Sequence, residues 1–231
     1  MPALTTIVLA TNNAHKVVEI QAILGGQFQF RTMRDFPKAP KTVEDAPTFG
    51  GNATKKAVEL AKYLSAGAFE HSTYVLADDS GLDVDALKGA PGVHSARFAA
   101  LERGQQSNSS DAENRAKLLR LLKDVPAEKR SARFRCVLAL TPLGGLEKRG
   151  ASPVCYADEY EMQTELFEGT CEGRIEFSEK GQGGFGYDSL FKPSGYAQTF
   201  GELAEEVKNR LSHRARALEK LGQRLKESEE D

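Results

Sequence analysis

Adjacent carboxylates at Asp78 and Asp79 are the strongest chemical signal in the sequence, because they directly follow the apolar run 73–77. Uncompensated charge at the end of a buried strand costs free energy. Mg²⁺ would offset that charge, since it prefers carboxylates together with substrate phosphates. Side chains alternate along a strand, so we expect one carboxylate to face the cation while the other braces an acidic turn at 78–81. An ordinary polar turn rich in Asp and Gly is the alternative.

A second candidate is the stretch 11–16, which follows the β-branched, apolar run 5–10 and opens a helix. A helix start presents N–H groups and the positive end of the helix dipole, which together can hold phosphate. Lys16 would add a full positive charge in the first turn. The alternative is an ordinary N-cap followed by a surface lysine. The members of this stretch are Thr11, Asn12, Asn13, Ala14, His15 and Lys16.

A glycine-rich loop at 180–188 carries an isolated aromatic residue, Phe185. Glycine lets the backbone approach a ligand closely, and a ring between glycines has little neighbouring apolar surface to pack on. Such a ring can serve as a platform for base stacking. The alternative is a flexible hairpin loop with Phe185 tucked into the core. The stretch lacks the GKS or GKT ending that the phosphate-binding P-loop needs.

Basic residues gather at the start of the last predicted helix, where His213 and Arg214 follow Ser212, a candidate N-cap. Lys208 lies shortly before them. Basic side chains are unfavourable near a helix N-terminus, so their placement indicates a bound anion. An ordinary solvated surface is the alternative.

These residues require a scaffold of buried strands and amphipathic helices, and the hydrophobic pattern supplies both. The stretch 89–109 is rich in Gly, Ser and Asn, which predicts a loop. The stretch 142–164 looks irregular, and we assign no function to it. The alternation of strands and helices indicates an α/β fold in which a curved sheet carries helices at both ends, as one domain over 1–231. Strands are predicted at 5–10, 73–77, 132–141 and 165–177, and helices after 11–13, at 52–64, after a capping box at Ser110–Glu113, near 201–208 and at 213–228.

Composition narrows the class of protein. The 31 Lys+Arg against 33 Asp+Glu leave a net charge of −2, whereas chains that wrap nucleic acid usually show a basic excess. No apolar run approaches the ~18 residues of a membrane span, and no basic segment precedes an apolar run as in a signal peptide. Cys136, Cys155 and Cys171 have neither CxxC nor zinc-ligand spacing. We expect a soluble cytoplasmic protein with reduced thiols and with no nucleic-acid or membrane partner.

Four stretches, in order across nearly the whole chain, resemble the inosine triphosphate pyrophosphatase family: LATNNAHK, ADDSGLDVDALKGAPGVHSARFA, GGFGYDSLF and SHRARAL. The resemblance implies an α/β fold with a long mixed curved sheet that forms two lobes, helices around it and the active cleft between them. It also implies a homodimer.

The resemblance further implies Mg²⁺-dependent hydrolysis of dITP, ITP, XTP or dXTP to the monophosphate and pyrophosphate, which cleanses the nucleotide pool. By position, Thr11 to Lys16 resemble the segment that grips the triphosphate. Asp79 corresponds to the general base and metal-linked carboxylate, and Ser80 to a substrate contact. The remaining correspondences are Phe185, Gly186, Tyr187 and Asp188 around the base, and Lys208, His213 and Arg214 closing on base and phosphates.

One position departs from the family pattern. Aligned on Thr48-Phe49 and Lys56, the family's metal-binding glutamate is replaced by Gly51. Glu44 or Asp45 is expected to supply the missing carboxylate, and the spacing does not choose between them. Two other functions stay open: a purine-nucleotide-binding protein with little or no turnover, motivated by Gly51, and a pool-cleaning pyrophosphatase for modified pyrimidines.

Overall fold

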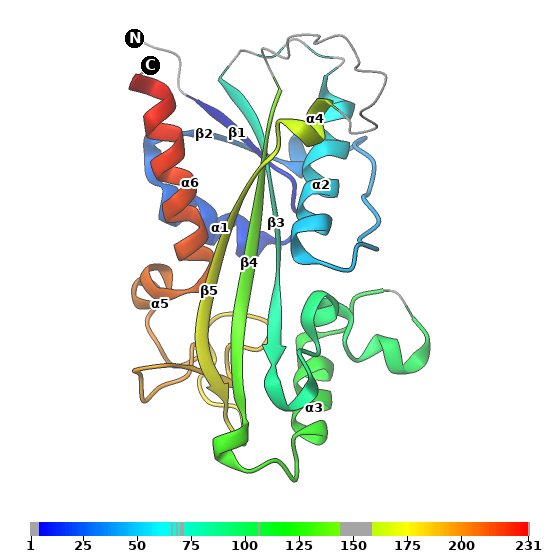
Figure 1. Cartoon of the computed structure of the whole chain (residues 1–231), viewed down its shortest axis with the longest axis vertical. Coiled ribbons are helices and arrows are strands. Elements are labelled where there is room, and N and C mark those ends of the chain that lie inside the picture. The colour runs from blue at the N-terminus through cyan, green and yellow to red at the C-terminus, as the bar shows by residue number, and fades with distance from the viewer. Residues whose placement is uncertain are drawn as a thin grey trace. The chain divides into compact units, whose positions relative to one another are not determined.

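The computed structural model describes residues 5–65, 67, 69, 72–105, 107–143 and 159–230. Its strands form a six-stranded sheet in the order β2-β1-β3-β4-β5-β6 (Figure 1). The sheet is mixed, since β1 pairs in parallel with β2 and β3 while β5 pairs antiparallel with β6. The strands are β1 (Thr6–Leu9), β2 (Gln29–Thr32), β3 (Thr73–Val84), β4 (Ser131–Pro142), β5 (Glu165–Ile175) and β6 (Phe191–Pro193), and the helices are α1 (Ala14–Leu24), α2 (Phe49–Leu64), α3 (Asp111–Leu121), α4 (Glu159–Met162), α5 (Glu205–Leu211) and α6 (His213–Glu230). The mixed α/β architecture expected from the sequence is confirmed.

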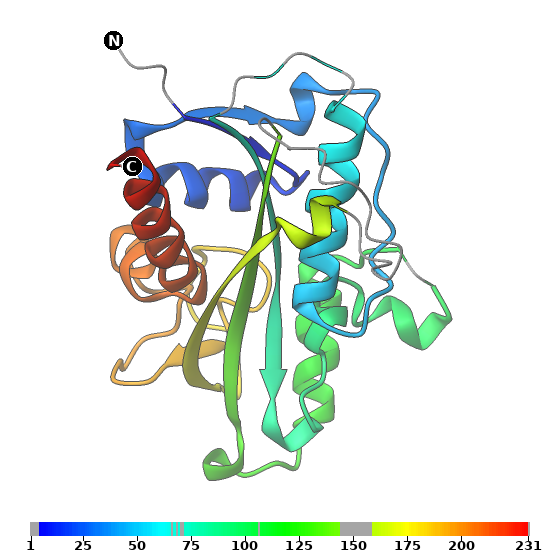
Figure 2. The same ribbon diagram turned by 45° about the horizontal axis from the view of Figure 1, so that its top comes forward.

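The chain divides into two compact units. Unit 1 comprises Met1–Asp79, Val137–Phe167 and Leu218–Asp231, and unit 2 comprises Ser80–Cys136 and Glu168–Ala217. The three long strands β3, β4 and β5, drawn side by side in Figure 2, each contribute residues to both units. In β3 the division falls between Asp79 and Ser80.

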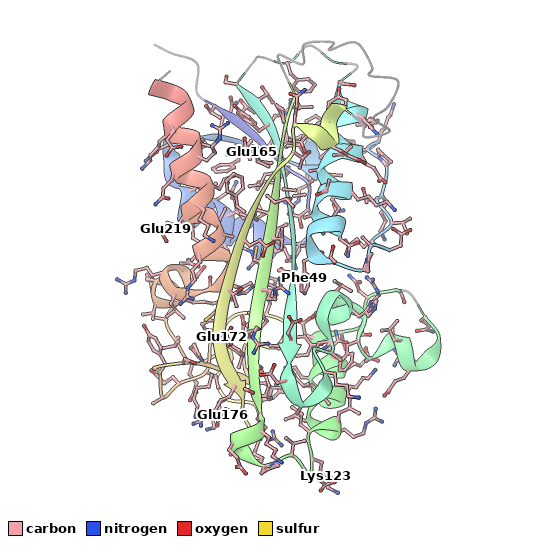
Figure 3. All side chains as sticks on the ribbon, in the orientation of Figure 1. Phe49, Lys123, Glu165, Glu172, Glu176 and Glu219 are labelled. Atoms are coloured by element: carbon pink, nitrogen blue, oxygen red, sulfur yellow. The ribbon has the colours of Figure 1, made fainter. Side chains whose placement is uncertain are left out.

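Unit 1 is built on β1, which is fully buried from Ile7 to Leu9, as its β-branched and apolar residues predict. Helix α1 follows at once, and the side chain of its N-cap Asn13 accepts hydrogen bonds from two backbone N–H groups of the first turn. Helix α2 begins at Phe49, labelled in Figure 3, three residues before the start predicted for it. Its N-cap is Thr48, whose side chain accepts from Gly51 N.

Unit 2 encloses an apolar core that includes Leu82, Phe98, Phe134, Phe191 and Phe200. The Phe134 ring meets the Phe191 ring edge to face, with centroids 4.7 Å apart. Helix α3 begins with the predicted capping box. Its N-terminus is therefore fixed by two reciprocal hydrogen bonds rather than frayed.

The structure corrects several local predictions. Residues 78–81 form no acidic turn, because β3 continues to Val84; lysines from neighbouring helices compensate the two carboxylates, so the charge does not end the strand. The stretch 89–109 is not simply a loop, since it contains two 3₁₀ helices, Gly92–Arg97 and Ala100–Arg103. The helix predicted near 201–208 begins at Glu205.

Part of the irregular stretch 142–164, together with Cys155, lies outside the described residues. Cys136 and Cys171 are buried and in no disulfide. Burial raises the pKa of the Cys171 thiol to about 11, so this side chain is a packing residue rather than a nucleophile. Within the described part of the chain, no helix combines the length and apolarity needed to cross a membrane.

Candidate functional site

Unit 1 gathers five charged side chains, here called the acidic–lysine cluster. Two come from β3, one from the first turn of α1, one from the middle of α2, and one from the loop that leads into α2. Because β1 and β3 run parallel and α1 follows directly from β1, the N-terminus of α1 arrives beside the middle of β3. The members are Lys16, Glu44, Lys56, Asp78 and Asp79.

Asp79 is the most constrained carboxylate of the acidic–lysine cluster and is only 6% exposed. Lys56 Nζ lies 2.9 Å from its Oδ1, and Asn52 Nδ2 donates to its Oδ2 at 3.3 Å. Burial raises the pKa of Asp79, and the positive charges of Lys56 and Lys16 only partly oppose that rise. Its pKa therefore lies above that of an ordinary aspartate.

Lys56 contacts all three acidic residues of this cluster. Its Nζ donates to the Asp78 carbonyl oxygen at 2.8 Å as well as to Asp79, and it lies 3.5 Å from a Glu44 carboxylate oxygen. Burial lowers the pKa of Lys56, but the surrounding carboxylates outweigh burial and the net shift is upward. Lys56 therefore stays protonated and holds the local structure of β3 and α2 together.

Asp78 is buried, and its Oδ1 accepts from Lys16 Nζ in an ion pair. The alternation expected for adjacent strand residues is thus seen in their partners, because Asp78 binds the lysine of α1 and Asp79 the lysine of α2. Lys16 is not simply a surface lysine, since its side chain is only 13% exposed. Its charge at the first turn of α1 is shared with the carboxylate of Asp78.

The structure explains how the chain accommodates Gly51. A Cβ at this position would lie 2.8 Å from the Cβ of Ala46, closer than real Cβ atoms come. The loop before α2 occupies that space because Ala46 N donates to Asn52 Oδ1 at 2.9 Å. A glutamate at position 51 would displace this loop.

The same loop distinguishes Glu44 from Asp45. Asp45 is largely exposed and pairs with Lys55 at 2.7 Å, away from the acidic–lysine cluster. Glu44 shares Lys56 with Asp79. Of the two carboxylates offered as replacements for the missing glutamate, Glu44 is the one that the fold brings to the cluster.

The donor set fits a hard divalent cation that is only lightly held by the protein. Its acidic members supply carboxylate oxygens, the ligands that such cations prefer, and a cation would compensate the buried charge of Asp79. Among the described residues, no three His, Cys, Asp or Glu side chains form a cage that would hold a metal by themselves.

Unit 2 carries a second group, here called the aromatic–cation cluster, made of Ser80, Phe185, Asp188, Lys208 and Arg214. Lys208 Nζ lies 2.7 Å from Asp188 Oδ2 and 4.9 Å from the centroid of the Phe185 ring. Arg214 Cζ lies 5.8 Å from the same centroid, and its Nη2 donates to Ser80 Oγ at 2.9 Å. Both cations are buried. Phe185 itself is half-buried and outside the apolar core of unit 2.

Other predicted site residues have local structural roles. The Tyr187 hydroxyl is buried and donates to the Ser95 carbonyl oxygen at 2.9 Å, and burial raises the pKa of this phenol. The His213 ring stacks on Phe134, with centroids 4.8 Å apart and 12° between the planes. Ser212 acts as the predicted N-cap, since its Oγ accepts from Ala215 N.

The predicted stretch 11–16 is arranged around its cap. Asn12, Ala14 and His15 are exposed, whereas Thr11 and Asn13 are half-buried. Thr11 Oγ1 accepts from Asn13 N at 3.1 Å, and Asn13 Oδ1 accepts from His15 N at 3.0 Å. The turn is thus fixed by its own side chains before the helix begins.

One known protein family matches most of this chain. The model of the Ham1 family matches residues 7–224. The chain belongs to the Ham1 family. It is 45% identical over 215 residues to the dITP/XTP pyrophosphatase of Desulforamulus reducens, covering 93% of this chain and 92% of the relative. It is 43% identical over 222 residues to that of Geobacillus kaustophilus, covering 96% and 94%.

Solved structures of this family have the same fold. The Staphylococcus aureus Ham1 protein superposes with a TM-score of 0.74 at 32% identity, covering 96% of this chain and 99% of that one. A HAM1 protein from Coxiella burnetii gives a TM-score of 0.74 at 35% identity, covering 96% and 98%. The family resemblance drawn from the four sequence motifs is confirmed.

Sequence reasoning missed one residue pair in each unit. In unit 1 the sequence analysis gave no role to Asn52 or Lys56. The two residues are four positions apart and therefore share one face of α2, which is otherwise apolar. Polar residues on such a face indicate a buried partner, here Asp79. Asp111 and Arg115 were also overlooked. They too are four residues apart on one helix, and both contact the backbone of Gly186.

Proposed function

We propose that this chain hydrolyses non-standard purine nucleoside triphosphates (dITP, ITP, XTP and dXTP) to the monophosphate and pyrophosphate, and so cleanses the nucleotide pool. One observation carries the proposal: consecutive residues of β3 belong to the two clusters, Asp79 to the acidic–lysine cluster and Ser80 to the aromatic–cation cluster. The first offers the chemistry of phosphate hydrolysis, and the second that of base recognition. The relatives above are named dITP/XTP pyrophosphatases, which supports dITP and XTP as substrates.

The acidic–lysine cluster would act on the phosphates. The start of α1 and the ammonium of Lys16 offset the negative charge of the triphosphate. Asp79 orients a water molecule and takes its proton. The water oxygen then bonds to the α-phosphorus, and the bond from that phosphorus to the bridging oxygen breaks, so that pyrophosphate leaves.

Mg²⁺ is the cofactor that we propose for this reaction, with Asp79 and Glu44 as the protein residues that would hold it. When bound, it offsets phosphate charge and polarises the phosphorus. Lys56 keeps both carboxylates in place, because its ammonium lies within 3.5 Å of each. The absence of a carboxylate at position 51 would affect the affinity for the cation more than the affinity for substrate.

The aromatic–cation cluster would recognise the base. Phe185 provides a stacking surface, and the buried cations Lys208 and Arg214 donate toward the purine 6-oxo group and the phosphates. An adenine amino group at that position would leave donors facing a donor, which costs roughly 1–3 kcal/mol for each unpaired group. Tyr187 and His213 pack on other residues of unit 2, so we assign them a structural role beside this cluster.

The deciding experiment is pyrophosphate release from dITP, XTP and dGTP, with Mg²⁺ titrated and an EDTA control. We expect fast, metal-dependent release from dITP or XTP and little from dGTP. Tight binding of dITP without release at any Mg²⁺ concentration would support the alternative, a purine-nucleotide-binding protein whose turnover was lost with the glutamate at position 51. Release from a methylated pyrimidine triphosphate instead would favour the pyrimidine-directed alternative.

Two substitutions test the proposed roles. Asp79→Asn should abolish turnover while nucleotide binding stays within about tenfold of the unmodified protein, and near-normal activity would contradict the role of general base. Lys16→Ala should weaken binding of the triphosphate far more than that of the monophosphate. Lys55→Ala is the matched control, since it removes a lysine paired outside the acidic–lysine cluster. Equal weakening of both nucleotides would argue against a phosphate contact for Lys16.

We also propose that the protein works in the cytoplasm as a homodimer. Sedimentation equilibrium across a range of protein concentrations tests the dimer, and a single species of 25.2 kDa would contradict it. Fractionation of cells tests the location.

A further inference from the structure

The backbone of Gly186 is held by two side chains of α3. Its N–H donates to Asp111 Oδ2 at 2.7 Å, and its carbonyl oxygen accepts from Arg115 Nη1 at 2.9 Å. Asp111 and Arg115 are four residues apart and therefore share one face of the helix. Both hydrogen bonds involve a charged group, the stronger class of hydrogen bond in proteins.

The same contacts continue to the far end of the loop. Arg115 Nε lies 2.9 Å from Glu179 Oε2, and that oxygen accepts from Ser189 Oγ at 3.2 Å. The side chains of α3 thus connect the residues before, within and after the loop that carries Phe185. The capping box at the start of α3 keeps the first turn, and with it Asp111, in a fixed position.

Carboxylates hold the backbone at Phe185 and at the residue that follows it. The N–H of Phe185 donates to Asp188 Oδ2 at 2.8 Å, and the next N–H, of Gly186, donates to Asp111. The peptide groups on both sides of Phe185 are therefore anchored by carboxylates. Gly186 has a φ of +62°, and a Cβ there would meet no atom within 4 Å. The glycine is thus required for its left-handed conformation rather than for space, and the hydrogen bonds from α3 hold that conformation.

We propose that Asp111 and Arg115 are positioning residues that set the base selectivity of the enzyme by holding Gly186 and, through it, Phe185. This inference rests on the proposed function, in which Phe185 stacks on a purine. A ring held in place before binding loses little freedom when the base arrives. Without the contacts from α3, the loop samples other conformations, and the ring no longer aligns the base edge with the donors that distinguish it.

The test uses two disruptive variants and two matched controls in the full-length protein. Asp111→Ala removes the acceptor, and Arg115→Met removes the guanidinium while keeping the apolar stem. Asp111→Asn keeps an acceptor oxygen but removes the charge that favours a helix N-terminus. Arg120→Met removes a guanidinium from the same helix whose partner, Glu102, is a surface residue.

Hydrogen exchange provides the first readout. We expect the Gly186 amide to exchange at least about tenfold faster in Asp111→Ala and Arg115→Met, because its fixed hydrogen bond is lost or loosened. Arg120→Met should stay close to the unmodified protein, and Asp111→Asn, which keeps a neutral acceptor, should lie between the unmodified protein and Asp111→Ala. Unchanged protection in both disruptive variants would overturn the role of α3 in holding the loop.

Selectivity provides the second readout. We expect the ratio of kcat/KM for dITP to that for dGTP to fall about tenfold or more in the disruptive variants, mainly through a higher KM for dITP. Lower activity that is equal for both substrates, with an unchanged ratio, would show a merely structural role and overturn the proposal. If the unmodified protein releases no pyrophosphate from dITP, the proposed function fails and the selectivity role fails with it, while hydrogen exchange still decides whether α3 holds the loop.

Discussion

Substitution of Lys56 by methionine isolates the energetics of the acidic–lysine cluster. Methionine keeps most of the apolar stem and has a similar helix propensity, so the change removes little besides the ammonium. That group donates to the Asp78 carbonyl oxygen at 2.8 Å and to Asp79 Oδ1 at 2.9 Å, and lies 3.5 Å from Glu44. Its loss leaves the buried carboxylate of Asp79 without its nearest positive charge.

The expected magnitude follows from burial. The side chains of Lys56 and Asp79 are 12% and 9% exposed, and removing one partner of a buried pair costs about 3–5 kcal/mol. Lys16 remains nearby and moderates the loss, so we expect the low end, about 3 kcal/mol of unfolding free energy. For a chain of this size that corresponds to a melting temperature lower by roughly 6–12 °C.

The neighbouring residue supplies the control. Lys55 pairs with Asp45, but these side chains are 33% and 66% exposed, and exposed pairs contribute about 0.2–1 kcal/mol. Lys55→Met should therefore change stability by less than about 1 kcal/mol. The two lysines lie on the same helix, so a general effect of losing a positive charge from α2 would appear in both.

The assay is urea unfolding followed by far-ultraviolet circular dichroism, because the chain contains no tryptophan. The double variant Lys56→Met/Asp79→Asn removes both charges and should recover part of the loss, giving a coupling energy of about 2 kcal/mol. A cost below about 1 kcal/mol for Lys56→Met, or costs that simply add in the double variant, would refute the argument.

Three further substitutions test other parts of the structure. Gly51→Ala should lower the unfolding free energy by about 1–3 kcal/mol, because its Cβ would overlap Ala46; an unchanged urea midpoint would contradict the packing described. Tyr187→Phe should cost about 1 kcal/mol by leaving the Ser95 carbonyl oxygen without its donor, while the KM for dITP stays within about twofold; a large rise in KM would instead make the hydroxyl a substrate contact. Hydrogen bonds from two lysines hold the pKa of Glu176, labelled in Figure 3, below its ordinary value of 4.5. Glu176→Gln should therefore lower stability by about 1 kcal/mol at neutral pH, and this difference should vanish as the pH falls through the native pKa of Glu176. Melting temperatures measured between neutral and acidic pH check this, and a difference that persists at low pH would contradict it.

Local sequence patterns were sufficient to predict those elements whose structure is decided by residues adjacent in the chain. The apolar run before Thr11 predicted β1, and the capping residues Asn13 and Ser110 marked the starts of two helices. Such features depend on hydrogen bonds and burial within a few residues of chain. The consecutive carboxylates of Asp78 and Asp79 likewise indicated the position of the acidic–lysine cluster, since adjacent negative charges on a buried strand need positively charged partners.

Contacts between distant segments could not be predicted in this way. The sequence placed the carboxylates in a turn, because it did not show that Lys16 and Lys56 would reach them from two different helices. It also left Glu44 and Asp45 equivalent, although they are consecutive residues that meet different lysines.

The sequence by itself therefore determined the family of this protein, its α/β class and the residue types at its chemical centres, because these are written in local order and spacing. Only the tertiary structure decided which charge meets which, why Gly51 has no room for a side chain, and how α3 holds the loop that carries Phe185. The physical reason is that ion pairs and hydrogen bonds act over a few ångströms in space, whereas the residues that form them are tens of positions apart in the chain.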